Sequence, residues 1–174
     1  PAEYSTGNYG SSAARNRMWR LASYYQFKEP AGSPGTVYFN PGFCSDETPT
    51  IDQSSKDQSE WLLAYQVDVG QPSGDTILYQ QGTAGCSYQI FGRSFTKALV
   101  LVRPKDGPTC TDFSDASAAT VTFTTPIQTL LENGTLSAPT TIVKIRNAEA
   151  VIAYQVGGVD TTPPSPPFGV TVRQ

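Results

Sequence analysis

The segment SYQIFGRSFTKALVLVRP, residues 87–104, decides the fold class of this chain because it holds two apolar runs of strand length. SYQIFG and KALVLVRP are short, rich in aromatic and β-branched residues, and separated by a polar stretch, which is typical of two β-strands joined by a turn. Similar runs lie on both sides of this segment, with turn residues between them. They are TILYQ (76–80), AATVTFTT (118–125), IQTLL (127–131), TTIVKIR (140–146) and EAVIAYQV (149–156). We therefore predict an antiparallel β-sandwich over residues 75–157.

The region before the sandwich, residues 1–74, has a different pattern. Apolar residues recur every three or four positions in residues 11–28 and again in 57–70, which predicts two amphipathic helices. Between them, TVYFN (36–40) is a short apolar run that predicts a buried strand. Helix, strand and helix in this order are typical of an α/β layer or barrel. The predicted fold class is therefore α+β, with a partial, barrel-like α/β segment followed by the antiparallel β-sandwich.

Composition and charge exclude several classes of function. The chain has 174 residues and a formal net charge of −3, so no basic surface is expected to neutralise phosphates, and nucleic acid is excluded as a partner. No apolar run approaches the roughly 20 residues that a membrane-spanning helix needs. There is no histidine, which removes Ser-His-Asp and Cys-His nucleophiles and the usual zinc ligand. We expect no cofactor and no metal, and the abundance of Tyr, Thr, Ser, Gly and Pro suggests an extracellular or cell-surface protein.

The cysteines are Cys44, Cys86 and Cys110, and no CxxC motif links them. Cys86 and Cys110 each lie just outside a predicted hairpin, so we predict that they form a disulfide, as suits an oxidising compartment. Three unconnected thiols are the alternative, because connectivity does not follow from sequence alone. If the disulfide forms, Cys44 is left over.

Motifs for catalysis are weak. The acidic pair in SDETPT (45–50) is typical of a solvated loop. NGT (133–135) matches an N-glycosylation acceptor, but Asn-Gly is also the strongest short hairpin signal, and we favour the turn. No catalytic residue is predicted from these motifs.

The last element is a proline-rich linker followed by one strand, residues 158–174. The prolines between positions 163 and 167 favour an extended polyproline rod. In FGVTVRQ, Phe168, Val170 and Val172 alternate with small or polar residues, which predicts a β-strand. A single strand is not stable alone. It therefore either opens a further domain or pairs with the sheet edge of another molecule.

Several motifs, taken in order, resemble the end of a glycoside hydrolase-like family, in which a (β/α)8 barrel precedes a small β-sandwich. RNRMWRLASYYQF (15–27) resembles a late barrel helix, TVYFNPGF (36–43) the last barrel strand, and SEWLLAYQVDVGQPSGD (59–75) the last helix and its exit. SYQIFGRSFTKALVLVRPKD (87–106) and IQTLLENGTLSAPTTIVKIRNAEAVIAY (127–154) are similar to parts of the family's sandwich. DTTPPSPPFGVTV (160–172) is similar to the linker and first strand of a fibronectin type III domain in secreted bacterial carbohydrate-active proteins.

The resemblance implies a carbohydrate-related role without catalysis by this chain. In such enzymes the catalytic acids lie at the ends of earlier barrel strands. This chain matches only the last strand, so no catalytic residue carries over. Phe39 and Asn40, at the end of that strand, are the positions that the resemblance places beside a substrate cleft, and carbohydrate is the partner it implies.

Two functions are consistent with these patterns. The first is a non-catalytic C-terminal portion of an extracellular carbohydrate-active protein. The alternative is a self-assembling extracellular structural or filament subunit, which donates residues 168–174 head to tail to a neighbouring copy. A stand-alone enzyme is disfavoured, because the chain lacks histidine and a recognisable acid pair.

Overall fold

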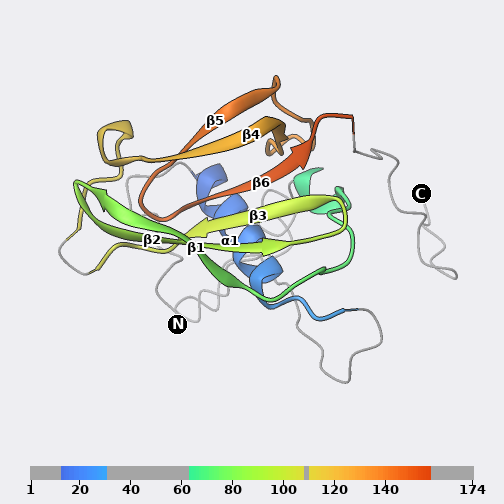
Figure 1. Ribbon diagram of the computed structural model, residues 1–174, viewed down its shortest axis with the longest axis horizontal. Coiled ribbons are helices and arrows are strands. Elements are labelled where there is room, and N and C mark those ends of the chain that lie inside the picture. The colour runs from blue at the N-terminus through green and yellow to red at the C-terminus, as the bar shows by residue number, and fades with distance from the viewer. Residues whose placement is uncertain (1–12, 31–62, 108–109, 158–174) are drawn as a thin grey trace, which may run out of the picture.

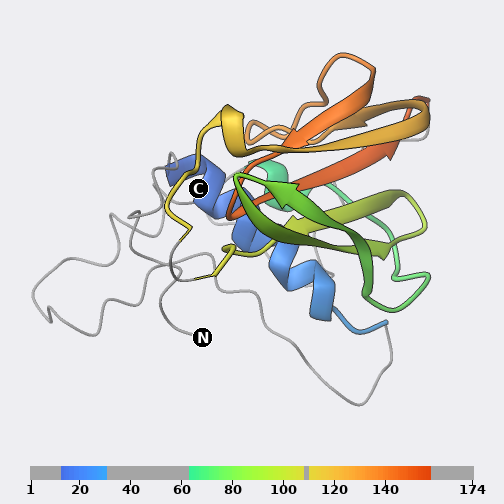
Figure 2. The ribbon, with the colours of Figure 1, turned by 60° about the vertical axis from the view of Figure 1, so that its left-hand side comes forward.

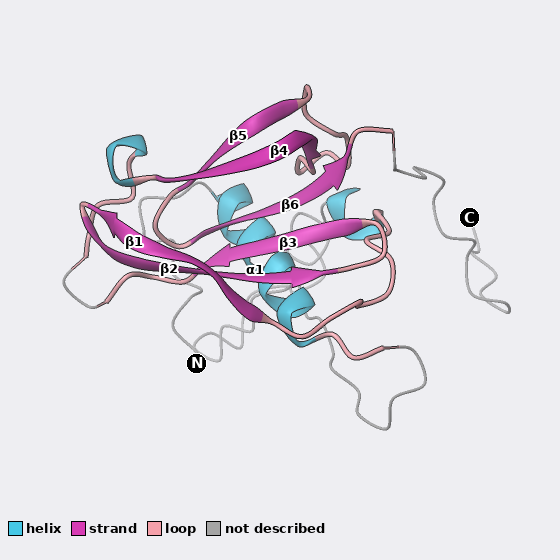
Figure 3. Ribbon diagram, viewed as in Figure 1, coloured by secondary structure: helices cyan, strands magenta, loops and turns pink. Residues whose placement is uncertain are grey.

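A curled antiparallel sheet with one helix against it forms the described part of the protein (Figures 1 and 3). The computed structural model describes residues 13–30, 63–107 and 110–157. Within them lie the helix α1 (Ala13–Phe27) and the strands β1 (Ile77–Ala84), β2 (Cys86–Ser94), β3 (Ala98–Arg103), β4 (Ala119–Thr129), β5 (Thr140–Ile145) and β6 (Glu149–Gln155). Two short 3₁₀ helices, Leu63–Gln66 and Asp115–Ser117, lie between these elements. The six strands are ordered β1-β2-β3-β6-β4-β5, and each neighbouring pair is antiparallel.

β3 lies inside the sheet and is covered on both faces. Its sequence ALVLVR is almost continuously apolar, as expected for a strand buried on both faces. Leu101 pairs with Gly92 of β2 on one side and with Val151 of β6 on the other. Successive side chains of a strand point to opposite faces, so β3 contributes to two separate apolar clusters.

The helix α1 covers one face of the sheet (Figure 2). Met18, Leu21, Ala22 and Tyr25 are buried and recur at helical spacing, so they form one apolar stripe. The stripe packs on outward-facing residues of β3 and β6, which are Ala98, Val100, Val102, Ile152 and Tyr154. The helix and the sheet therefore share one core.

The second apolar cluster fills the inside of the curl. It consists of Ile90, Leu101, Ala119, Val121, Ile127, Val143, Ile145 and Ala153. The curl also brings β1 towards β4, where Gln80 Nε2 donates to the carbonyl of Thr120 at 3.1 Å. A single sheet thus covers its own second face, which a flat sheet could not do.

The predicted fold class, an α/β segment followed by a separate sandwich, is wrong. The structure has one curled sheet in place of two packed sheets, and the described residues contain no barrel-type repeat of strand and helix. The helix expected over 11–28 is present as α1. The strand expected at 36–40 lies outside the described residues.

The second predicted helix, 57–70, is also wrong over its described part. Only Leu63–Gln66 is helical there, as a 3₁₀ turn. The backbone of the following residues is used in pairing with the β2–β3 turn: Lys97 N donates to Val69 O at 3.2 Å and Thr96 N to Gln71 O at 2.9 Å. Gly70, at φ 84°, turns the chain into this pairing. Tertiary hydrogen bonds therefore override the local helical pattern.

Two of the predicted strands are one strand in the structure. AATVTFTT and IQTLL both belong to β4, which continues through Pro126 with a register shift between Thr122 and Ile127. Before the shift β4 pairs with β5, and after it β4 pairs mainly with β6. The expected turn at Asn133–Gly134 is present, with Gly134 at φ 77°.

In the parts of the chain that are described, no helix is both long and apolar enough to span a bilayer.

Candidate ligand groove beside the disulfide

A disulfide joins Cys86, at the start of β2, to Cys110, beyond the end of β3. The two Cα atoms are 6.1 Å apart, and the residues are separated by 24 positions. The predicted pairing is therefore confirmed. Cys110 is buried, so the disulfide draws the segment after β3 onto the tip of the β1–β2 hairpin. In the chain-entropy model, a loop of this length contributes about 3.5 kcal/mol to stability.

A buried arginine fixes the same segment from inside. Arg103, the last residue of β3, is fully buried and forms a bidentate ion pair with Asp106, in which Nε donates to Oδ1 at 3.2 Å and Nη2 donates to Oδ2. Nη1 donates to the carbonyls of Ser117 and Ile145, each at 2.8 Å. The ring centroid of Tyr88 lies 4.8 Å from the guanidinium carbon. Arg103 thereby connects β2, β3 and β5 with the Asp115–Ser117 turn.

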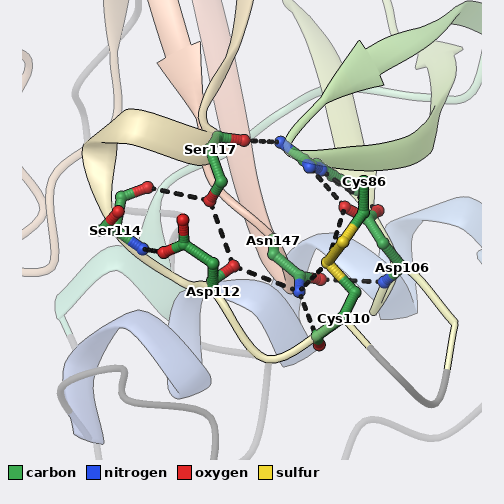
Figure 4. The surroundings of a disulfide bond; sticks show 8 residues. Cys86, Asp106, Cys110, Asp112, Ser114, Ser117 and Asn147 are labelled. Atoms are coloured by element: carbon green, nitrogen blue, oxygen red, sulfur yellow. Dashed lines mark hydrogen bonds and ion pairs between the residues drawn. A yellow bond between two sulfur atoms is a disulfide. The ribbon is translucent and has the colours of Figure 1, made fainter.

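A buried asparagine completes this polar centre (Figure 4). Asn147 Oδ1 accepts from the backbone nitrogen of Asp106 at 2.8 Å. Its Nδ2 lies within donating distance of the carbonyls of Cys110, at 3.3 Å, and Asp112, at 3.4 Å. One buried side chain thus bonds the backbone at three positions of the irregular segment after β3, which are Asp106, Cys110 and Asp112.

The far end of this segment is held by a capped turn. Ser117 Oγ donates to the carbonyls of Asp112 and Ser114, both at 3.1 Å. Hydrogen bonds from the side chain and backbone of Ser114 lower the pKa of the exposed Asp112 carboxyl. The disulfide, Arg103 and this turn therefore anchor Cys110, Asp106 and Asp112 to the sheet and the adjoining turn.

The groove lies between the β1–β2 hairpin and the start of this segment, and its volume is about 610 Å³. It is lined by Gln81, Gly82, Thr83, Ser87, Tyr88, Gln89, Pro104, Lys105, Asp106 and Gly107. The wall that comes from the hairpin carries no charged side chain. Its opposite wall carries Lys105 and Asp106, and the Asp106 carboxylate is occupied by Arg103.

The hairpin wall is a ladder of neutral hydrogen-bonding side chains. Gln81 pairs with Gln89 and Thr83 with Ser87 in the β1–β2 register. Directly opposed residues in an antiparallel pair project from the same face, so the two amides and two hydroxyls lie together. All four residues are exposed. Each amide offers both donors and an acceptor, and each hydroxyl offers both functions.

Gly82 lies opposite Tyr88, and this pair faces the other side of the hairpin from the ladder. A Cβ atom at position 82 would stand 2.9 Å from the Tyr88 hydroxyl oxygen. That hydroxyl accepts from Gln80 Nε2 at 2.8 Å, while the Tyr88 ring covers Arg103. The glycine therefore leaves room for the ring that couples the hairpin to the buried arginine.

Most of the other predicted positions cannot be placed beside this groove. Phe39, Asn40 and Cys44 lie outside the described residues, as do Phe168, Val170 and Val172. Within the ranges that are described, no group of three or more acidic or cysteine side chains is arranged to hold a metal ion.

The sequence interpretation missed both the groove and its buried support. One signal for the support was present, because Arg103 ends the otherwise apolar run ALVLVR. A charge at the end of a doubly covered strand needs a buried partner. The groove itself had no such signal, since glutamine, threonine and serine on a hairpin are ordinary surface residues.

Comparison of the chain with protein-family models, with curated proteins and with solved structures found no match. The resemblances to the glycoside hydrolase-like family and to the fibronectin type III segment therefore stay predictions. The groove is one feature of the described residues from which a function can be argued.

Proposed function

We propose that this chain is a non-catalytic β-module of an extracellular carbohydrate-active protein, and that the groove beside the disulfide binds a neutral polysaccharide. The observation that carries the proposal is the ladder of Gln81, Gln89, Thr83 and Ser87 on one wall of the groove. The hydroxyl groups of a sugar both donate and accept hydrogen bonds, and amide and hydroxyl side chains match both functions.

The rigid frame of the groove supports the same proposal. Binding costs conformational entropy when side chains and loops must be ordered, so a site that is already fixed binds more tightly. The disulfide and the Arg103–Asp106 pair hold the wall after β3 before any ligand arrives. A disulfide also suits a protein that works in an oxidising, extracellular compartment.

The experiment is a binding titration of the whole chain against soluble polysaccharides such as β-glucan, xylan, mannan and galactan, followed by calorimetry. We expect one or more of them to bind. The double substitution Gln81→Ala with Gln89→Ala should then weaken binding by roughly 1–3 kcal/mol, about five- to 150-fold, because it removes two amides that exchange hydrogen bonds with the sugar.

Gln66→Ala is the matched control, because Gln66 is an exposed glutamine on the Leu63–Gln66 turn, away from the groove. It should bind as the unaltered chain does. The proposal is wrong if no polysaccharide binds, or if the double variant and the control bind equally. Release of reducing sugar by the chain would contradict its non-catalytic part.

A further inference from the structure

β1 is an edge strand without the charged residues or prolines that commonly protect such an edge. Natural edge strands carry lysine, proline or other charged residues that discourage addition of a further strand. The sequence of β1, ILYQQGTA, contains none of these. Among the described residues, no strand pairs with its outer side. Its one irregularity is the register shift towards β2 between Leu78 and Gln80.

The open end of β1 is also apolar. Ile77 is 59% exposed, Leu78 46% and Tyr79 37%. Phe27, at the end of α1, is 68% exposed. It lies beside this end of β1, because Thr76 Oγ1 donates to the carbonyl of the preceding Gln26 at 2.8 Å. The contact of β1 with β4 is made further along, by Gln80, and leaves these residues uncovered.

The opposite edge of the sheet differs. β5 has the sequence TTIVKI and carries the exposed Lys144 as its fifth residue, together with the exposed Ile142. A lysine in this position is a common device against edge pairing. The two edges therefore have similar exposed isoleucines, but only β1 combines apolar side chains with an uncharged edge.

We propose that the outer edge of β1 accepts residues 168–174 of a second copy of this chain as an added antiparallel strand. FGVTVRQ has the alternation of a strand and is close in length to β1. In strand addition the main chain supplies the hydrogen bonds, and alternate side chains meet the apolar surface. The proposal does not depend on the carbohydrate groove, which lies at the other end of β1.

The strand directions favour a second copy as the donor. Ile77 pairs with Gly92, and the register continues through β2 and β3 to the last residues of β6. The start of β1 and the end of β6 therefore lie at the same end of the sheet. A strand from the same copy that crossed directly from the end of β6 would enter there and run parallel to β1. An antiparallel strand must enter from the opposite end, and antiparallel pairing is the more stable.

The linker gives the donated segment the reach that this requires. If the ten residues 158–167 adopted an extended polyproline conformation, which rises about 3.1 Å per residue, they would span about 31 Å. Three strand spacings, from β6 to β1, take up only about 14 Å. The segment can therefore extend past its own sheet to a neighbouring one.

The test is the molar mass of the full chain in solution as a function of concentration, measured by light scattering on a size-exclusion column. We expect association that rises with concentration. Ile77→Lys should abolish it, because it puts a charge on the acceptor edge, and Val170→Pro should abolish it by removing a backbone donor from the added strand. Ile142→Lys is the matched control and should associate like the unaltered chain.

Mixing identifies the two roles. The Ile77→Lys copy keeps an intact donor, and the Val170→Pro copy keeps an intact acceptor, so an equal mixture should form heterodimers that neither variant forms alone. The proposal is overturned if the unaltered chain is monomeric at every concentration, or if the mixture of the two variants stays monomeric. It is also overturned if Ile142→Lys abolishes association while Ile77→Lys does not, or if the Val170→Pro variant still associates. Far-ultraviolet circular dichroism verifies that each variant is folded.

Discussion

Replacing Arg103 with methionine should lower the free energy of unfolding by about 3–5 kcal/mol. Methionine keeps most of the side-chain volume but removes the charge. Asp106, only 7% exposed, would be left as a buried carboxylate without its bidentate partner. The carbonyls of Ser117 and Ile145 would each lose a donor in the interior. Since small domains are stable by about 5–15 kcal/mol in total, this one substitution would remove a large part of that margin.

Urea unfolding, followed by tryptophan fluorescence at neutral pH, measures the effect. The control is Arg146→Met, because Arg146 forms partly exposed ion pairs with Asp115 and Glu149 and should cost about 1 kcal/mol or less. The double variant Arg103→Met with Asp106→Leu should recover part of the loss, since it removes the buried charge as well. If Arg103→Met costs no more than Arg146→Met, Arg103 is not the support of the segment after β3.

Three further predictions concern the same frame and the core beside it. Replacing Cys86 and Cys110 by serine should lower the unfolding free energy by about 3.5 kcal/mol, measured in urea without reductant. Gly82→Ala should destabilise the hairpin, because its Cβ would stand 2.9 Å from the Tyr88 hydroxyl, and thermal unfolding reports it. Burial raises the pKa of Tyr154. The fold therefore favours the neutral form of Tyr154. The resulting contribution to the free energy of unfolding is complete below about pH 10 and is lost as the pH rises further. Unfolding measured at increasing alkaline pH tests this.

Each of these predictions has an outcome that contradicts it. If the unaltered chain and the variant with serine at positions 86 and 110 had the same free energy of unfolding, the disulfide would not stabilise the fold. The control for Gly82 is Gly74→Ala, since a Cβ at Gly74 meets nothing within 4 Å, and equal melting of the two variants would refute the steric argument. If Tyr154 in the folded chain ionised at the pH at which a solvent-exposed tyrosine does, its hydroxyl would be accessible to water.

The strands were predictable because their patterns are local. Alternation and continuous apolar runs identified part of every strand of the sheet, and helical spacing identified α1, but the prediction at 76–80 omitted the second half of β1. The same patterns do not distinguish one curled sheet from two packed sheets, because both bury alternate residues. The helix expected over 57–70 failed for a different reason, since Val69 and Gln71 bond to the β2–β3 turn.

The candidate site was less predictable than the fold. The positions of Cys86 and Cys110 around a hairpin favoured the disulfide that the structure contains, although they did not determine it. The ladder of Gln81 and Gln89 depends on the pairing register of β1 and β2. A register shift of one residue would have placed the side chains of one strand on the other face of the sheet. The ion pair of Arg103 also depends on the path of the chain after β3, which places Asp106 against the guanidinium group. The spacing of residues in the sequence does not predict that path.

The most direct test of the proposed function is a nuclear magnetic resonance titration of the isotope-labelled chain with a soluble polysaccharide that binds it. The account predicts that the side-chain amide signals of Gln81 and Gln89 shift progressively and saturate, while those of Gln66 stay in place. Signals of the two groove glutamines that do not move, or shifts confined to another face of the sheet, would contradict the claim that this groove holds a carbohydrate.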